Sequence, residues 1–175
     1  MTIEELVEKD SSFNSSIFIS KANNIIKKMY NAITLDELDT INSFVSDEVF
    51  NNFKKKVDEA KANHEVLTYE QVNVSTEIKS IEEVNGYYKI SCNAYCRYYE
   101  TYYSENGKYL YGDKNAPREV IHQAIFAKKI GTGLDNVVRC LGCGMSLNVI
   151  ESGKCPNCGR IFESEDFDYY LELYV

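Results

Sequence analysis

The sequence predicts an α+β fold in which N-terminal helices pack on a curved, cone-shaped antiparallel sheet. Three observations predict it. Apolar residues recur at helical spacing in the first third of the chain, the period then changes to strand-like alternation, and a cysteine-rich segment interrupts that alternation before a last strand. The expected units are residues 1–136 for the helices and main sheet, 137–163 for a small inserted module, and 164–175 for a final strand that returns to the sheet.

The first expected helix has a continuous apolar stripe. Its members recur at spacings of three or four residues and are Phe18, Ala22, Ile25, Met29 and Ile33. This spacing places them on one face of a helix, where they would pack against the sheet.

Two more helices are expected before the sheet. The pattern Thr34-Leu-Asp-Glu37 predicts a capping box at the start of the second helix, whose buried side would carry Leu35, Leu38 and Ile41. Ser46 is expected to cap the third helix, because a serine hydroxyl can accept a hydrogen bond from a free backbone amide of the first turn.

Alternation begins after His64 and predicts three long strands. Val72, Val74 and Ile78 share one face of the first strand, and the turn Asn85-Gly86 leads into the second. The inward face of the second strand is expected to carry Ile90, Cys92, Ala94, Cys96 and Tyr98. The segment from Glu119 to Ile130 is apolar on both faces, which predicts a central strand. Residues 167–175 predict the final strand.

The outward face of the second strand is rich in phenols. It carries Tyr95, Arg97, Tyr99 and Tyr103. Aromatic side chains with polar tips are enriched at interfaces, so these four residues are a candidate contact face. Ordinary cross-strand pairing is the alternative interpretation.

The strongest motif is a set of four cysteines, Cys140, Cys143, Cys155 and Cys158, which form two Cys-x-x-Cys pairs separated by eleven residues. This spacing predicts a zinc ribbon that holds one structural Zn²⁺, because four protein thiolates fill the tetrahedral coordination and leave no position for substrate. Iron on the same thiolates, or disulfides, are the alternatives. Cys92 and Cys96 stand apart and are expected to be buried thiols.

Composition limits the possible functions. The net charge of −8 argues against broad nucleic-acid binding, since phosphate contacts need a basic face. The sequence has no long apolar run and no signal-peptide pattern at its start, which predicts no integral membrane segment and a cytoplasmic location. Zinc thiolates also suit a reducing compartment.

His122 is the candidate for chemistry inside the cone. It shares strand parity with Val120 and Ala124, which points it toward the interior, where nearby tyrosines could complete a polar pocket. A strand histidine can equally make a structural hydrogen bond.

Several segments together resemble a known family. Asp10-Ser-Ser-Phe13, the helix with its Ile and Met stripe, and the segments 36–46 and 119–130 look like the domain of the mitochondrial translocase subunit Tim44. The two cysteine pairs and the segment Phe167-Asp-Tyr-Tyr-Leu171 resemble a bacterial branch with a C-terminal zinc ribbon. The resemblance implies the fold of nuclear transport factor two and a role connected with protein transport. The chain departs from it by having no tryptophan and no N-terminal membrane segment.

These observations favour a non-catalytic binding or scaffold protein with a structural Cys₄ zinc ribbon. Its expected partner is another protein, and a homodimer is a further option. The alternative is a small-molecule-binding or enzymatic cone domain with His122 in its pocket.

Overall fold

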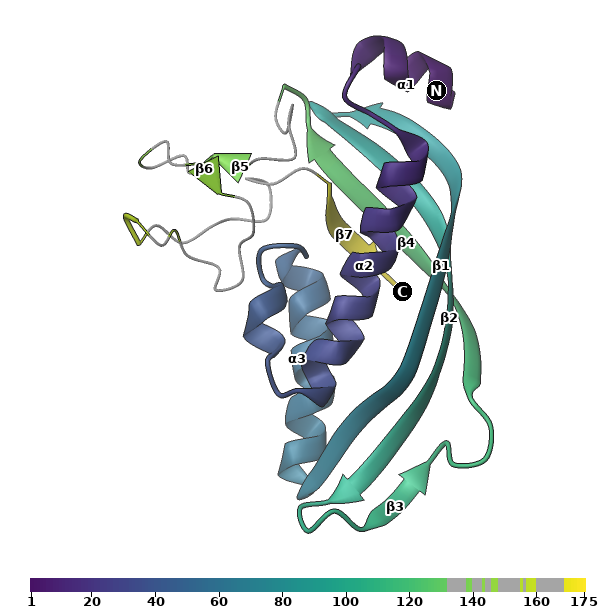
Figure 1. Cartoon of the computed structure of the whole chain (residues 1–175), viewed down its shortest axis with the longest axis vertical. Helices are drawn as coiled ribbons and strands as arrows, with labels where there is room; N and C mark the ends of the chain where they lie inside the picture. Colours follow the sequence, from purple (N-terminus) through teal and green to yellow (C-terminus); the bar gives the residue numbers. More distant parts are fainter. Residues whose placement is uncertain (132–137, 140–142, 144–145, 148–154, 156, 160–168) are drawn as a thin grey trace.

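The computed structural model describes residues 1–131, 138–139, 143, 146–147, 155, 157–159 and 169–175 (Figure 1). Helices come first: α1 (Ile3–Lys9), α2 (Ser15–Thr34), the short 3-10 helix η1 (Leu38–Ile41) and α3 (Asp47–Ala62). A strongly curled antiparallel sheet follows, and α2 lies along its concave side (Figure 1). The predicted α+β class with a curved sheet is confirmed.

The main sheet has five strands, which are β1 (Glu65–Val84), β2 (Tyr87–Ser104), β3 (Tyr109–Gly112), β4 (Arg118–Lys129) and β7 (Tyr170–Tyr174). The order is β1-β2-β4-β7, with β3 paired to β2. The prediction that the segment from Glu119 to Ile130 forms a central strand is confirmed, because β4 lies between β2 and β7. The short strands β5 (Val138–Arg139) and β6 (Ser146–Leu147) pair with each other in a separate two-stranded sheet.

The helix predictions need two corrections. Thr34 does not open a second helix: it is the last residue of α2, and its hydroxyl accepts a hydrogen bond of 2.7 Å from the Tyr69 amide. The expected helix shrinks to η1, and Leu35 is 64% exposed. On α2, Ile26 is fully buried, whereas Ile25 only packs at the edge of the core. Ser46 caps α3 as predicted, with its hydroxyl 3.2 Å from the Val49 amide.

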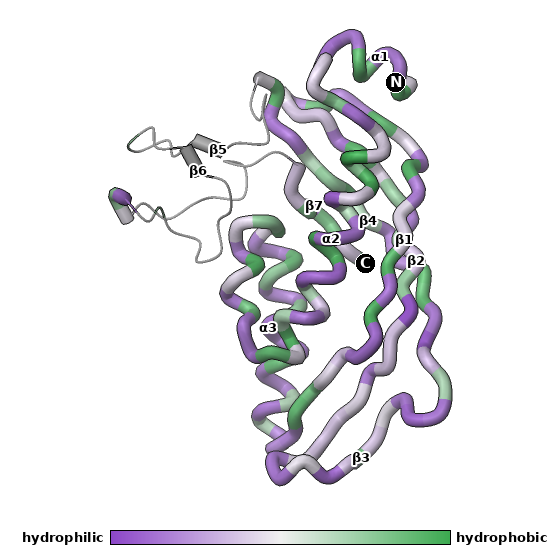
Figure 2. The backbone as a smooth tube through the Cα atoms, in the orientation of Figure 1, coloured by the Kyte–Doolittle hydropathy of each residue, from purple (hydrophilic) through white to green (hydrophobic). Residues whose placement is uncertain are grey.

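Two β-bulges explain how β1 stays amphipathic while it curves. The register shifts between Glu70 and Asn73, where Gln71 has a φ of 51°, and again between Ile78 and Ser80. Each extra residue bends the strand and resets its alternation. Buried positions therefore follow different parities before and after the first bulge. The alternation of polar and apolar residues along β1 and β2 can be followed in Figure 2.

A buried ion pair joins the N-terminal segment to the sheet. Lys128 of β4 is 2% exposed, and its ammonium lies 2.5 Å from a carboxylate oxygen of Asp10. Ser12 donates hydrogen bonds to the other oxygen of Asp10 through both its amide and its hydroxyl. Although burial opposes it, the contacts with Lys128 and Ser12 hold the pKa of Asp10 below its ordinary value. The link between α1 and α2 is thereby fixed to β4.

Candidate functional site

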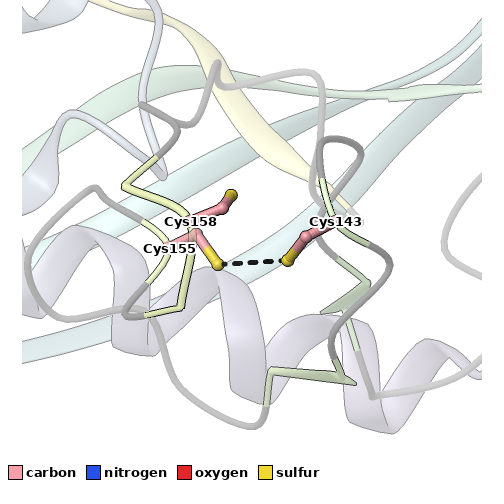
Figure 3. Close-up of side chains that lie close together, drawn as sticks. All are labelled: Cys143, Cys155 and Cys158. Atoms are coloured by element: carbon pink, nitrogen blue, oxygen red, sulfur yellow. Dashed lines mark hydrogen bonds between the residues drawn. The ribbon is translucent and has the colours of Figure 1, made fainter.

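Three of the four motif cysteines come together. The sulfur atoms of Cys143, Cys155 and Cys158 all lie within 4.8 Å of one another (Figure 3). The Sγ atoms of Cys143 and Cys155 are 3.8 Å apart. Thiolates bound about 2.3 Å from a tetrahedral zinc ion would be about 3.8 Å apart, so this spacing fits a shared metal ion. Cys140 lies outside the residues that the structure describes.

The second cysteine pair has the local geometry of a metal-binding turn. Gly159 has a φ of 76°, which favours glycine, and its amide donates to the Cys155 carbonyl at 2.9 Å. The Asn157 side-chain amide lies 3.5 Å from the Cys143 sulfur. An N–H group directed at sulfur stabilises the thiolate form that metal binding needs. These residues can therefore hold a soft metal ion through thiolates.

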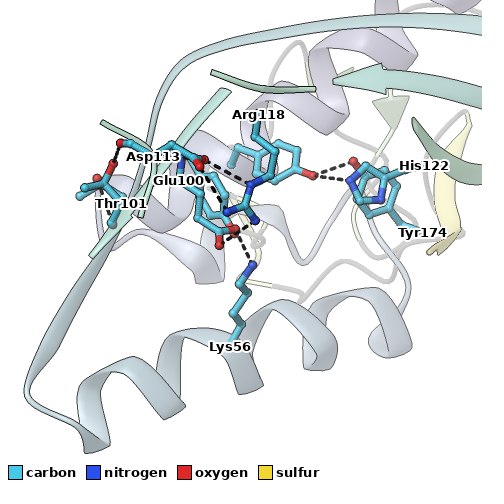
Figure 4. A network of polar contacts seen from close by, with 10 residues as sticks. Lys56, Glu100, Thr101, Asp113, Arg118, His122 and Tyr174 are labelled. Atoms are coloured by element: carbon cyan, nitrogen blue, oxygen red, sulfur yellow. Dashed lines mark hydrogen bonds and ion pairs between the residues drawn. The ribbon is translucent and has the colours of Figure 1, made fainter. Parts of the chain in front are cut away.

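The interior of the half-barrel is built around Tyr30 of α2. Its hydroxyl lies 2.8 Å from the Tyr174 hydroxyl and 3.3 Å from Nε2 of His122. The His122 ring stacks on Tyr174 with centroids 4.5 Å apart, and the two are seen together in Figure 4. His122 thus faces the interior, as its parity predicted.

Aromatic rings surround this hydrogen-bonded group. The rings of Tyr69 and Tyr98 each have centroids 4.8 Å from that of Tyr30, and all three residues are at most 4% exposed. Burial raises the pKa of Tyr30 and Tyr174 and lowers the pKa of His122, so all three are neutral at pH 7. Neutral groups that already make hydrogen bonds with one another form a structural network.

Cys92 and Cys96 are buried, as expected. Burial raises the pKa of Cys92 to about 12 and also raises the pKa of Cys96, whose sulfur lies 3.4 Å from the Tyr174 hydroxyl. Thiols with raised pKa values stay protonated and unreactive. They belong to the core.

Two of the hollows on the described surface bear on the predicted sites, and neither is lined by His122. One, of about 790 Å³, lies between the end of α2, η1 and α3, with Leu35, Phe44 and Val57 in its lining. The other, of about 290 Å³, is lined by Tyr99 and Tyr103 of β2 together with residues of β1 and β3. Neither is lined by Tyr30 or Tyr174.

A charged network that was not predicted from the sequence lies at the end of the half-barrel interior. Glu100 is 7% exposed, and its carboxylate lies 2.7 Å from Lys56 of α3 and 3.3 Å from Arg118 of β4 (Figure 4). Asp113 also pairs with Arg118, at 3.2 Å. The strand parity of Glu100 was the available signal, because it continues the inward row that ends at Tyr98.

Hydrogen bonds keep Glu100 ionised although it is buried. Burial opposes ionisation, but the hydrogen bonds from Lys56 and from the Tyr69 hydroxyl, the latter 2.8 Å long, hold the pKa of Glu100 below its ordinary value. The carboxylate is therefore ionised at neutral pH and links α3 to three strands.

The candidate contact face divides into two pairs. Tyr95 is 42% exposed and its hydroxyl donates to Glu77 at 3.1 Å, while the Arg97 side chain lies 3.8 Å from Glu119. Tyr99 and Tyr103 are half-buried in the smaller hollow. All four residues lie on the outward face of β2, as their alternation predicted. Their role in contact stays a prediction.

The fold and the cysteines define an α+β half-barrel domain with a cysteine cluster that can bind a metal ion. The family model of the Tim44-like domain matches residues 1–137, and the chain belongs to this family. No curated protein matches the chain. In the part of the chain that the structure describes, no helix is both long and apolar enough to cross a membrane.

Proposed function

We propose that this protein is a non-catalytic, protein-binding scaffold whose ribbon, residues 137–163, is held by one structural Zn²⁺ on Cys140, Cys143, Cys155 and Cys158. The observation that carries the metal assignment is the convergence of three sulfur atoms at a spacing that suits tetrahedral zinc. A closed Cys₄ site would fix the fold of the ribbon and leave no coordination position for chemistry.

Membership of the Tim44-like family supports the scaffold role and a connection with protein transport. The packed interior supports it as well, since the groups that an enzyme would need there are buried and hydrogen-bonded to one another. A partner would then meet the outer surfaces, among them the face with Tyr95 and Arg97. A cytoplasmic location and a homodimer remain predictions.

Elemental mass spectrometry on protein purified without added metal tests the ribbon. We expect one zinc per chain, a thermal transition that shifts on chelation, and loss of the metal in Cys155→Ser. Cys92→Ala is the matched control and should keep its zinc, because that thiol is in the core. Iron at one ion per chain, or no metal, would overturn the zinc assignment.

Affinity isolation with the full chain tests the scaffold role. We expect a protein to be recovered at a fixed ratio to the chain, to bind again as a purified component, and to be lost with the double variant Tyr95→Ala, Arg97→Ala. Lys55→Ala, on the exposed side of α3, should change nothing. Recovery of a bound small molecule in place of a protein would contradict the proposal.

The alternative, a small-molecule-binding or enzymatic cone with His122, receives less support. The imidazole already contacts Tyr30 and stacks on Tyr174, and it does not line either of the two hollows described above.

A further inference from the structure

The smaller hollow on the outer face of the sheet has the composition of a cation site. It lies at the end of the sheet where β3 pairs with β2, far from α1 (Figure 1). Tyrosines from two strands line it, Tyr99 and Tyr103 of β2 and Tyr109 of β3, and acidic residues stand at its edge, Glu70 and Asp113. We call it the outer hollow.

An ammonium group of this chain already lies there. The Lys114 ammonium is 4.7 Å from the centroid of the Tyr109 ring. The Tyr103 ring meets Tyr109 edge-on, with centroids 6.3 Å apart and planes at 80°. The face of an aromatic ring attracts a cation through its quadrupole. The hollow therefore accommodates a lysine head group without rearrangement.

Charge complementarity favours the same ligand. Glu70 stands directly opposite Tyr99 in the register of β1 and β2, on the same face. Its exposed carboxylate makes no ion pair with any residue in the described part of the chain. Asp113 is already neutralised by Arg118. The carboxylate beside the rings that is open to a second cation is thus Glu70, in a protein of net charge −8.

Backbone features fix the walls of the outer hollow. Gln71, next to Glu70, has a φ of 51° at the bulge of β1. Gly112 has a φ of 114°, and a Cβ atom there would lie 2.4 Å from the Glu100 carbonyl oxygen, so β3 can approach β2 this closely only with glycine. The Tyr109 hydroxyl donates to the Gly112 carbonyl at 2.8 Å, which orients its ring. Bulges that redirect side chains are common beside functional sites.

We propose that the outer hollow binds the ammonium group of a lysine side chain presented by a partner protein, in place of Lys114. The existence of the site follows from the rings and Glu70, and only the source of the lysine rests on the proposed scaffold function. Lys114 then acts as an internal competitor that a partner lysine displaces.

Titration of the ¹⁵N-labelled full chain at pH 7 with Nα-acetyl-lysine methylamide tests the site by NMR. We expect amide shifts confined to residues 70–71, 99–103 and 109–114. We expect none with the norleucine analogue, which keeps the four-carbon side chain of lysine but lacks the ammonium group. Lys114→Ala should tighten binding roughly threefold, and Tyr109→Leu or Glu70→Gln should weaken it by at least about as much. Tyr95→Leu, on the same face outside the hollow, is the matched control and should bind as the parent does.

Equal shifts with the norleucine analogue, or unchanged binding in both Tyr109→Leu and Glu70→Gln, would overturn the inference. The partner isolation described above is independent of this titration. Recovery of a partner without binding of the lysine compound would reject the cation site alone. Binding of the lysine compound without a partner would support the site and reject the scaffold role.

Discussion

The inner and outer faces of the sheet use the same kinds of residue in opposite ways. On the inner face, the tyrosine hydroxyls and the charges of Glu100 and Lys128 are buried and bonded to groups of this chain. On the outer face, Tyr95 is exposed and Glu70 makes no ion pair with a described residue. A phenol or carboxylate that is buried and bonded within the chain has a structural role, whereas an exposed one can contact a ligand.

Acid should lower stability the most, because it protonates two carboxylates at once: Glu100 on the inner face, and Asp10, which pairs with Lys128 of that face. A carboxylate whose pKa is lower in the folded than in the unfolded chain stabilises the fold at pH values above the unfolded pKa. This contribution is lost as the pH falls through the folded pKa. For Asp10 and Glu100 the loss begins below about 3.8 and 4.5. Urea unfolding between pH 7 and 2.5 should show stability falling in this window.

The variants Asp10→Asn and Glu100→Gln provide the control for the acid experiment. Each should flatten the acid limb of the profile, since its carboxylate no longer titrates. A profile as steep as that of the parent would show that these two groups do not carry the effect.

Lys128→Met should be the most damaging single change among those considered. It leaves Asp10 as a buried charge without its ammonium partner, which costs about 3–5 kcal/mol in comparable pairs. Denaturant unfolding would measure the loss. Lys27→Met, at an exposed position of α2, should change stability by less than about 0.5 kcal/mol. Equal effects at the two positions would contradict the inner-face assignment.

Gly112→Ala should destabilise by about 2 kcal/mol or more, because the new Cβ would meet the Glu100 carbonyl oxygen. Gly107 also has a positive φ, of 84°, but no atom lies within 4 Å of an added Cβ, so Gly107→Ala should cost only about 1 kcal/mol. Thermal melting compares the two. A Gly112→Ala protein as stable as Gly107→Ala would show that the close approach of β3 is not needed.

Tyr30→Phe should have the smallest effect that is still measurable on the inner face. It removes a buried hydroxyl that bonds Tyr174 and His122, at a cost of about 1–2 kcal/mol. Tyr95→Phe removes an exposed hydroxyl that bonds Glu77 and should stay within about 0.5 kcal/mol of the parent. A larger loss of stability for Tyr95→Phe than for Tyr30→Phe would contradict the contrast between the two faces.

Alternation along β2 correctly predicted its buried row from Ile90 to Tyr98 and the outward position of Tyr95 and Tyr99. A single alternation does not describe the whole of β1, because the bulge at Gln71 shifts which residues face inward. No local residue pattern predicts that bulge. The capping-box prediction at Thr34 failed for a related reason. The hydroxyl that would cap a helix bonds the backbone of Tyr69, a residue 35 positions away.

Residue order alone was enough to predict helices followed by strands, the buried row of β2, and a zinc ribbon from the spacing of four cysteines. These features depend on short-range periodicity and spacing, which the order of residues encodes directly. Long-range packing, in contrast, pairs Lys56 and Arg118 with Glu100 and brings Tyr99 and Tyr109 into one hollow. Those contacts join residues that are far apart along the chain. They depend on how strongly the sheet curls and where its bulges fall, so local pattern cannot specify them.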